Sequence, residues 1–418
     1  MRHPRIAISL VALAIATLVA CGSDPAPAPM RFLHTFSPDE TELFNSTIAS
    51  RGLVVESSLV PFARGQQVIG EILTAGTTCP DLIRIDATWL PGLRAHLVAP
   101  PPELTSVDWT PEAATLAQLE GVWWGVPQTV DGLIVIRDSA TPAPASPSID
   151  DLVAAARATK SEGRRFPLAT RVDGYWLVPW LRAAGADVAV DRVGDPARRN
   201  APATDAAADA ATDAAEPATD AATAAATTPA TKDGATRALA RYGALFGDVA
   251  APPPPAGSEA PDELRRWNSH EVAYWITGPW RLGALRDPER IAVTAIHGAP
   301  RGGQLLVVPR CAKRPADGWR LAAELASVPV EVTFANAFRT IPTRVAALAQ
   351  APALSRAAAD ALRTAEMLPR SAITPLLFDD LNPALAAVVA GDATAEEAIA
   401  GVRRGWARLA ARQDAAPP

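Results

Sequence analysis

The stretch 120–138 constrains the fold more than any other part of this sequence. It reads EGVWWGVPQTVDGLIVIRD, in which a Gly-Val-Pro break and the polar residues Gln128 and Asp131 separate two apolar runs. Pro127 cannot donate a hydrogen bond to a sheet, and it disfavours helix in the residue before it. The pattern predicts a strand, a break and a second strand, with the chain leaving one sheet at Pro127 and entering another. Polar residues at such a crossing would lie between the two parts of the protein that these sheets form.

The length and charge of the chain narrow the classes of protein it can belong to. Its 418 residues are too many for one hydrophobic core and suit two domains, and 49% of them are hydrophobic, enough to fill both. The formal net charge is -6, and the arginines are scattered rather than clustered. We therefore expect no basic face and no nucleic-acid partner.

The first 20 residues have the pattern of an export signal. Arg2 and Arg5 precede the apolar segment 6–20, which is shorter than the ~18 to 20 apolar residues that span a bilayer. Small residues lead into Cys21, and this junction resembles the lipobox of bacterial lipoproteins, in which the cysteine is lipidated. We predict a signal peptide over 1–20 and a lipidated tether over 21–30. The protein is then expected outside the cytoplasm, lipid-anchored in the cell envelope. A plain secretory signal, in which Cys21 is incidental, stays open.

Two further cysteines would meet an oxidising compartment after export. Cys79 lies just before a predicted strand, and Cys311 lies just after another. We predict a disulfide between them, while two separate buried thiols stay an alternative because spacing alone does not fix geometry.

Hydrophobic periodicity predicts two consecutive βαβ units in the first part of the chain. Ser37, with Glu40 three residues on, forms a capping box that opens the first helix, and the second helix ends at Gly76. The predicted order is strand, helix, strand, helix, strand over 31–36, 37–52, 53–60, 68–76 and 81–86. Two βαβ units imply a parallel sheet, whose ligand crevice lies beyond the carboxyl ends of its strands.

The later chain combines low-complexity tracts with further helices and strands. The tracts 200–232 and 251–261 have too few large apolar residues to offset the conformational entropy lost on ordering. We therefore expect them to be disordered. After them, the pattern predicts a helix over 262–275, strands over 291–296 and 304–308, and helices from 316 onward.

The sequence lacks the common signatures of catalysis and metal binding. It contains no GxSxG elbow, no HExxH, no P-loop and no Cys/His cluster with metal-ligand spacing. We therefore expect no cofactor and no metal, and an enzyme is disfavoured.

Short motifs along the chain share their order and spacing with one family. They are Gln67 through Cys79-Pro80-Asp81 to Asp86 and Trp89, Trp124-Gly125-Val126-Pro127 with Asp131 and Arg137-Asp138, Val272-Ala273, Gly278-Pro279-Trp280, Gly302-Gly303, Ile341-Pro342-Thr343, and Gly391 with Glu396-Glu397-Ala398. On these residues the chain resembles the extracellular solute-binding proteins of ATP-binding-cassette (ABC) sugar importers, family 1, which include the maltose- and trehalose-binding proteins. The resemblance covers nearly the whole mature chain apart from the two low-complexity tracts.

The resemblance implies an α/β fold of the two-lobed periplasmic-binding-protein class, type II, with a ligand cleft between the lobes. Lobe one would comprise 31–127 and 288–341, and lobe two 128–287 and 342–418. The implied function is a monomeric, high-affinity receptor that binds a mono- or oligosaccharide, such as a disaccharide, and delivers it to the membrane permease. Two alternatives stay open, a secreted glycoside hydrolase and a sensor or adhesin on the same fold.

The resemblance also implies a set of ligand contacts. Asp131 matches a carboxylate aimed at sugar hydroxyls, and Trp280 matches the tryptophan after Gly-Pro on which a pyranose stacks. In the hydrolase alternative, Asp86 and Asp131 would be the acid and base, and a simple helix-capping role for Asp86 is also open. The full set of expected contacts is Phe36, Arg64, Gln67, Asp86, Trp89, Asp131, Trp176, Trp280, Arg339 and Phe378. Arg64 and Arg339 are the only basic residues in it, so a phosphorylated ligand would depend on them.

Overall fold

The computed structural model describes residues 28–161, 164–189, 233–253 and 263–415. The predicted signal peptide, Cys21, most of the predicted tether, the tract 200–232 and most of the tract 251–261 lie outside the described residues. Predictions made for those parts stay predictions.

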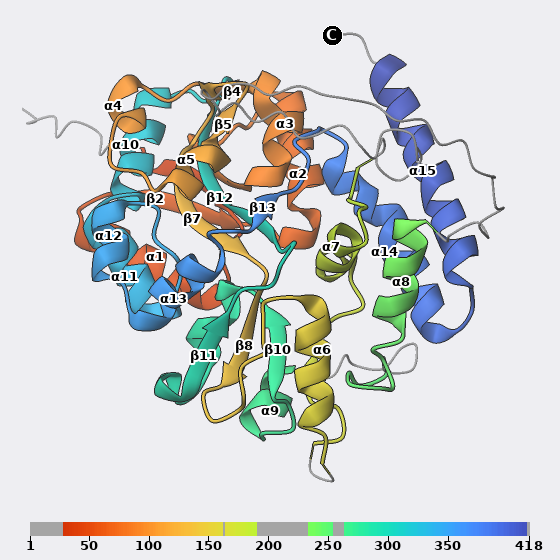
Figure 1. Ribbon diagram of the computed structural model, residues 1–418. Helices are drawn as coiled ribbons and strands as arrows, with labels where there is room; N and C mark the ends of the chain where they lie inside the picture. The colour runs from red at the N-terminus through yellow and green to blue at the C-terminus, as the bar shows by residue number, and fades with distance from the viewer. Residues whose placement is uncertain (1–27, 162–163, 190–232, 254–262, 416–418) are drawn as a thin grey trace, which may run out of the picture.

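A seven-stranded sheet forms one end of the molecule, shown at the top in Figure 1. Three of its strands are parallel, in the spatial order β2-β1-β3, and a long strand, β12, continues the sheet antiparallel to β3. The strands are β1 (Met30–His34), β2 (Val55–Leu59), β3 (Leu82–Asp86), β4 (Leu97–Val98), β7 (Val126–Gly132), β12 (Pro300–Pro309) and β13 (Glu366–Met367). The βαβ order predicted from the sequence is confirmed.

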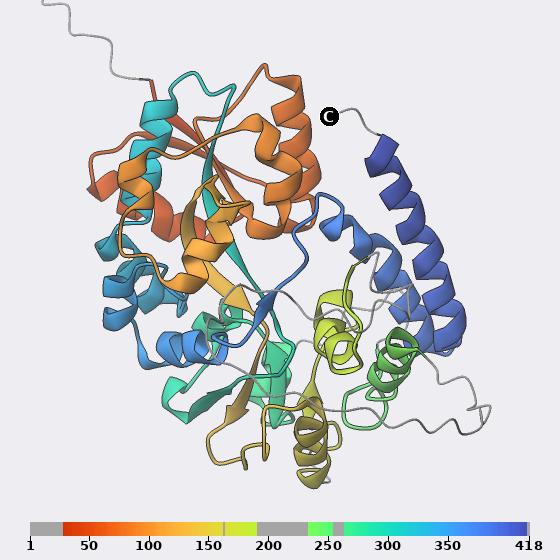
Figure 2. The same cartoon turned by 45° about the horizontal axis from the view of Figure 1, so that its top comes forward.

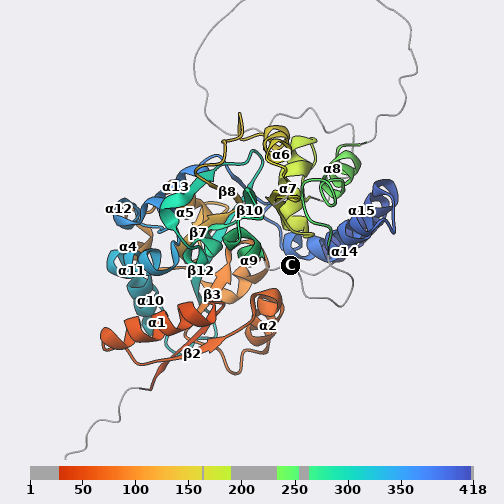
Figure 3. The same cartoon turned by 90° about the horizontal axis from the view of Figure 1, so that it is seen from below.

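Helices cover both faces of this sheet because its strands are apolar on both faces. Leu82 and Leu306 pack with α1, α10 and α11, whereas Ile83 and Leu305 belong to the core that α2 joins (Figure 3). The helix α1 (Pro38–Ser50) begins at the predicted capping box, in which the Ser37 N–H donates to Glu40 Oε2 over 2.8 Å. The other helices here are α2 (Phe62–Ala75), α3 (Leu90–Leu93), α4 (Pro102–Thr105), α5 (Pro111–Ala117), α10 (Pro315–Leu325), α11 (Val328–Phe338), α12 (Val345–Gln350) and α13 (Ala353–Ala361).

The crossing between sheets lies later than the sequence predicts. β7 continues through Pro127 to Gly132, with a register shift at which Leu305 faces Pro127 and Gln304 faces Thr129. Gln128 is the extra residue of this bulge, where a proline without an N–H is tolerated. The chain changes sheet only after Gly132, where a Cβ would lie 2.5 Å from the Pro300 carbonyl oxygen. The prediction that the chain leaves the sheet at Pro127 was therefore wrong.

A second sheet of four strands forms the other end of the molecule, in the order β11-β8-β10-β9. Its strands are β8 (Ile134–Asp138), β9 (Leu168–Ala169), β10 (Tyr274–Thr277) and β11 (Ile291–Thr294), and its helices are α6 (Ile149–Ala158), α7 (Gly174–Ala183), α8 (Gly234–Gly243) and α9 (Glu263–Asn268). The prediction of one helix over 262–275 is corrected. α9 ends at Asn268, and the run that follows is a fully buried strand because β8 and β9 pair with it on both sides. β11 lies in this sheet although it falls within 288–341, the segment predicted to belong to lobe one.

The C-terminal helices α14 (Leu377–Ala390) and α15 (Ala395–Ala415) pack against α7 and α8 (Figure 2). Trp406 anchors α15, since its buried indole donates to the Leu377 carbonyl over 2.9 Å. A short hairpin, β5 (Gln118–Leu119) with β6 (Val122–Trp123), completes the strands. No helix among the described residues is long and apolar enough to cross a membrane.

Cys79 and Cys311 are joined in a disulfide, with their Cα atoms 5.7 Å apart. The bond links the segments before β3 and after β12, two strands that are paired in the seven-stranded sheet. It therefore fixes residues that are 232 positions apart in the chain.

Candidate functional site

A cleft of about 1520 Å³ lies beyond the carboxyl ends of the parallel strands. One side consists of α2 and the ends of β3, β7 and β12, and the other of α7, the start of α14 and the 3₁₀ helix η4 (Pro279–Ala284). The ligand contacts expected from the sequence that line this cleft are Gln67, Asp86, Trp89, Asp131, Trp176, Trp280 and Phe378. The cleft thus brings together residues of the seven-stranded sheet with residues of helices from the other part of the molecule.

Four residues on three adjacent strands form what we call the polar floor: Arg84, Asp86, Asp131 and Gln304. In the strand register, Asp86 faces Gln304, and Asp131 faces Gly302. Directly opposed residues point to the same side of a sheet, and so do residues two apart in a strand. The register therefore places all four side chains on one face.

Asp86 is the most constrained carboxylate of the polar floor. It accepts hydrogen bonds from the backbone N–H of Thr88 (2.8 Å), from the Thr88 hydroxyl (2.5 Å) and from Gln304 Nε2 (3.1 Å). The capping role left open for Asp86 is thereby confirmed, since it is the N-cap of the 3₁₀ helix η1 (Ala87–Trp89). Burial raises the pKa of Asp86, while these hydrogen bonds and the charge of Arg84 oppose the rise.

Arg84 brings a buried positive charge to the polar floor. Its side chain donates to Gln128 Oε1 (3.0 Å) and to Thr35 Oγ1 (2.8 Å), and its guanidinium lies 4.5 Å from the ring centroid of Phe36. Burial lowers the pKa of Arg84, and the nearby carboxylates of Glu40, Asp131 and Asp86 partly restore it. The sequence analysis missed Arg84, although an arginine in the middle of an otherwise apolar strand was a usable signal.

Asp131 lies at the end of β7, where it borders the cleft. Burial and then the negative charge of Asp86 raise the pKa of Asp131 to about 7, against the opposing effects of Gln304 and Arg84. Gly302 makes room for this carboxylate, because a Cβ there would lie 3.1 Å from Asp131 Oδ1. Asp131 and Asp86 are thus two acids held close enough to disfavour full ionisation of both.

Gln304 is another residue that the sequence analysis missed. It is 6% exposed, its Nε2 donates to Asp86, and its buried Oε1 has no hydrogen-bond partner among the described residues. The preceding Gly303 lets β12 approach β7, since a Cβ there would lie 2.3 Å from the Thr129 carbonyl oxygen. Gly302 and Gly303 therefore leave room for the Asp131 carboxylate and for the close pairing of β12 with β7.

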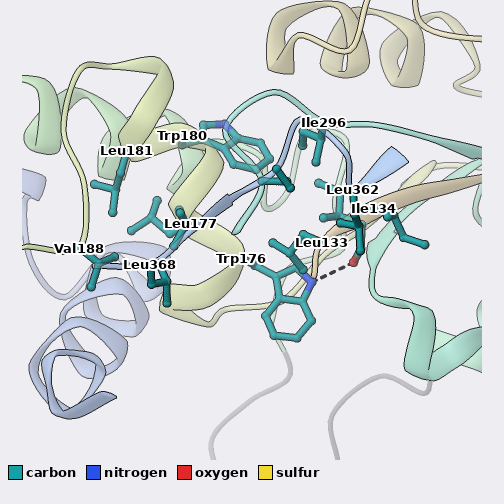
Figure 4. Close-up of a cluster of buried hydrophobic side chains, with 14 of the residues drawn as sticks. Leu133, Ile134, Trp176, Leu177, Trp180, Leu181, Val188, Ile296, Leu362 and Leu368 are labelled. Atoms are coloured by element: carbon teal, nitrogen blue, oxygen red, sulfur yellow. Dashed lines mark hydrogen bonds between the residues drawn. The ribbon is translucent and has the colours of Figure 1, made fainter. Parts of the chain in front are cut away.

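Four aromatic residues form what we call the aromatic wall on the opposite side of the cleft: Tyr175, Trp176, Trp280 and Phe378. Trp176 and Trp280 meet edge to face, with ring centroids 6.3 Å apart. Trp176 is held by a hydrogen bond from its Nε1 to the Ile276 carbonyl (2.8 Å) and packs into the apolar core of Figure 4. Trp280 is 44% exposed, so it presents ring surface to a ligand.

Glycine positions the ring of Trp280. A Cβ on Gly278 would lie only 2.1 to 2.4 Å from carbon atoms of that ring. In the Gly-Pro-Trp motif, the absence of a side chain on Gly278 therefore lets the Trp280 indole fold back over the turn.

The helix α2 supplies the remaining aromatic contact. Trp89 is buried beneath α2, and a Cβ on Gly65 would lie 2.5 Å from its ring. Phe62, which is 54% exposed and was missed from the sequence, lies with its ring centroid 5.2 Å from that of Trp89. Gln67 borders the cleft and donates to Glu71 over 2.9 Å.

Phe36 does not line the cleft, so that expectation is corrected. Its ring is 3% exposed and packs in an aromatic cluster with Phe32, Phe44 and Phe334. The capping box that follows turns the chain into α1, so the ring lies against the core and supports Arg84 from beneath.

The two arginines expected at the cleft also lie outside it. Arg64 is exposed on α2, off the helical face on which Ala63, Gln67 and Gly70 border the cleft. Arg339 ends α11 with a φ of 60°, and its guanidinium donates back to the Asn336 carbonyl. The basic pair on which a phosphorylated ligand would depend is therefore not present in the cleft.

Solved structures show which fold this is. The GacH receptor of Streptomyces glaucescens, solved unliganded and with acarbose, is similar with a TM-score of 0.70 and 20% identity, over 91% of this chain and 98% of that one. An ABC-transporter solute-binding protein from Thermotoga lettingae, bound with α-D-tagatose, has a TM-score of 0.69 and 19% identity, over 91% and 99%. The sugar-binding protein MalE from Xanthomonas citri has a TM-score of 0.69 and 16% identity, over 93% and 98%.

The fold is therefore that of the two-lobed periplasmic-binding proteins, as the resemblance in the sequence implied. The sequence itself matches no protein-family model and no curated protein. At identities of 20% and below, the likeness establishes the fold, and the ligand has to be argued from the cleft.

Proposed function

We propose that this protein is an extracytoplasmic receptor that binds a sugar in the cleft and delivers it to an ABC permease. The observation that carries the proposal is the pairing of a polar floor with an aromatic wall across one cleft. Carboxylates accept strong hydrogen bonds from hydroxyl groups, and flat rings cover the apolar C–H face of a pyranose. The similar solved structures, which bind acarbose, tagatose and maltotriose, support the same reading.

A hydrolase that uses Asp86 and Asp131 is less well supported by the site. Asp86 accepts from Thr88 through one oxygen and from Gln304 through the other. Both oxygens of Asp86 are thus engaged within the protein, whereas a general acid needs to reach the leaving group.

Binding is expected to close the cleft. The floor stands on the seven-stranded sheet and the wall on helices across the cleft, so a sugar contacts both fully only in a closed form. Moving a population from about 1:99 to 99:1 takes ~5.5 kcal/mol, and micromolar binding supplies about 8 kcal/mol. Ordinary sugar affinity is therefore enough to drive closure.

Thermal-shift screening across sugars, polyols and phosphorylated sugars tests the proposal, because a ligand of the native state raises its melting temperature. We expect neutral or amino sugars to stabilise the protein and sugar phosphates not to. Small-angle scattering with the best ligand should then show a smaller radius of gyration. A panel in which no saccharide raises the melting temperature would contradict the proposal.

The proposal includes a lipid anchor at Cys21 and a location on the outer side of the cytoplasmic membrane or at the cell surface. It is supported by the export signal and the small residues before that cysteine. A Cys21→Ala protein should leave the membrane fraction, and its full recovery there would refute the anchor.

A further inference from the structure

Carboxylates outnumber guanidinium groups along the cleft. The carboxylates that line it are Glu40, Glu71, Asp86, Asp131, Asp173 and Asp379, and the guanidinium groups are Arg84, Arg171 and Arg301. One of the three arginines is already neutralised, since Arg171 Nε lies 2.9 Å from Glu263 Oε1. The field in the cleft is therefore negative, which repels anionic ligands and attracts cations.

Asp131 has little positive charge around it. The positive charge that acts on Asp131 is that of Arg84, whose guanidinium already donates to Gln128 and Thr35. A ligand cation beside Asp131 would therefore add a charge-assisted hydrogen bond.

An ammonium group fits this arrangement better than a hydroxyl group does. A hydroxyl has one hydrogen to donate, whereas a protonated amine has three and carries a charge. One ammonium can donate a charge-assisted hydrogen bond to Asp131, and such bonds are about twice as strong as neutral ones.

The aromatic wall is also suited to a cation. Trp280 presents exposed ring surface to the cleft, and aromatic faces attract cations within about 6 Å of the ring centroid. The neighbouring Trp176 already carries one such contact, because the Arg171 guanidinium lies 4.9 Å from its ring centroid.

We propose that the ligand of this cleft is an amino sugar, or an oligosaccharide containing one, whose protonated amine is held by Asp131 and faces the aromatic wall. The inference rests on the proposed sugar-binding function and specifies its substrate class. Burial and the charge of Asp86 raise the pKa of Asp131, and a cation bound beside it would favour its ionised form.

The test compares sugars that differ at one substituent. Glucose, glucosamine and N-acetylglucosamine, and the β-1,4-linked disaccharide of each, are titrated calorimetrically into the full mature protein. We expect the amine to bind about tenfold more tightly than its hydroxyl and N-acetyl counterparts. In Asp131→Asn this ratio should fall to near one, because the amide keeps the shape and loses the charge.

Glu42→Gln is the matched control, since it removes one negative charge at an exposed position of α1 that does not line the cleft. It should keep the tenfold ratio. If Asp131→Asn fails to fold, Trp280→Leu removes the exposed ring that attracts the cation instead and should lower the ratio about threefold.

The outcomes separate this inference from the proposed function. Saccharides that bind with no preference for the amine, or a preference that survives in Asp131→Asn and Trp280→Leu, overturn the amino-sugar inference and leave the receptor function standing. If none of the six sugars nor any other saccharide of the screen binds, both fail.

Discussion

The two sides of the cleft are built in different ways. The polar floor stands on paired strands, and three of its four residues are buried, with Gln304 donating to Asp86. The aromatic wall stands on the helices α7 and α14 and a 3₁₀ turn, and its principal residue, Trp280, is 44% exposed. A side chain fixed by a sheet contributes to folding as well as to recognition, whereas an exposed ring contributes mainly to recognition. Substitutions in the floor and in the wall should therefore affect different measurements.

Replacing Arg84 should produce the largest effect, and it should be an effect on stability. Arg84→Met removes the buried cation that binds Gln128 and Thr35 and that offsets the charge of Asp86 and Asp131. The free energy of unfolding is expected to fall by about 3 kcal/mol, measured by urea denaturation. Arg310→Met, at an exposed position, should change it by less than ~0.5 kcal/mol. Equal losses of unfolding free energy in Arg84→Met and Arg310→Met would contradict a structural role for the polar floor.

Replacing Trp280 should affect binding and leave stability nearly unchanged. Trp280→Ala removes an exposed ring that can stack on a sugar, so affinity should fall about 30-fold, or ~2 kcal/mol, by calorimetry. The protein should also stay open, by scattering, at ligand concentrations that close the wild type. Trp123→Ala is the matched control, because this half-buried tryptophan lies outside the cleft. If Trp280→Ala bound the sugar with wild-type affinity, the aromatic wall would not be part of the binding site.

A methyl group at Gly278 should reproduce part of that loss without touching the ring itself. The added Cβ would meet the Trp280 ring at 2.1 Å, so Gly278→Ala should displace the indole and weaken binding about tenfold. Gly401→Ala is the control, since the nearest atom to its Cβ is 3.9 Å away on a flexible arginine. An unchanged affinity in Gly278→Ala would show that the ring position is not fixed by this glycine.

The smallest expected effect is the pH dependence contributed by Asp131. Its folded pKa of about 7 lies above the ordinary value of 3.8, so the folded state holds the proton more tightly than the unfolded state. Protonation of Asp131 therefore stabilises the folded protein at low pH. This stabilisation is lost as the pH rises from about 4 to about 7. Asp131→Asn should be more stable than wild type by about 1 kcal/mol at pH 8 and similar to it at pH 4. Parallel stability curves for the two proteins would contradict the raised pKa.

Sequence reasoning recovered what depends on local pattern. The capping box of Ser37 and Glu40 located α1, and hydrophobic periodicity located the parallel strands. Asp131 and Trp280 were found through short motifs, and both line the cleft.

The missed features depend on pairing between distant segments. Gln304 meets Asp86 across 218 positions, and no local pattern reports that register. The start of the strand Tyr274–Thr277 was assigned to a helix because a short apolar run fits either structure, and only its partners β8 and β9 decide. Phe36 was misplaced for a related reason, since whether a ring at a strand end points to the core depends on the helices packed there.

The position of β12 has a consequence for how the chain emerges during synthesis. This strand pairs with β3, β4, β7 and β13, yet it follows the entire four-stranded sheet in the sequence. Domains usually fold in order as they leave the ribosome or the membrane pore, but here the first sheet lacks its interior strand until Pro309 has appeared. Until then β3 and β7 have unpaired edges of the kind that invite association with other chains. A chain stopped before Pro300 should show weak hydrogen-exchange protection in β3. The two ends of the molecule therefore complete their folding together, in one cooperative step after β12 has been synthesised.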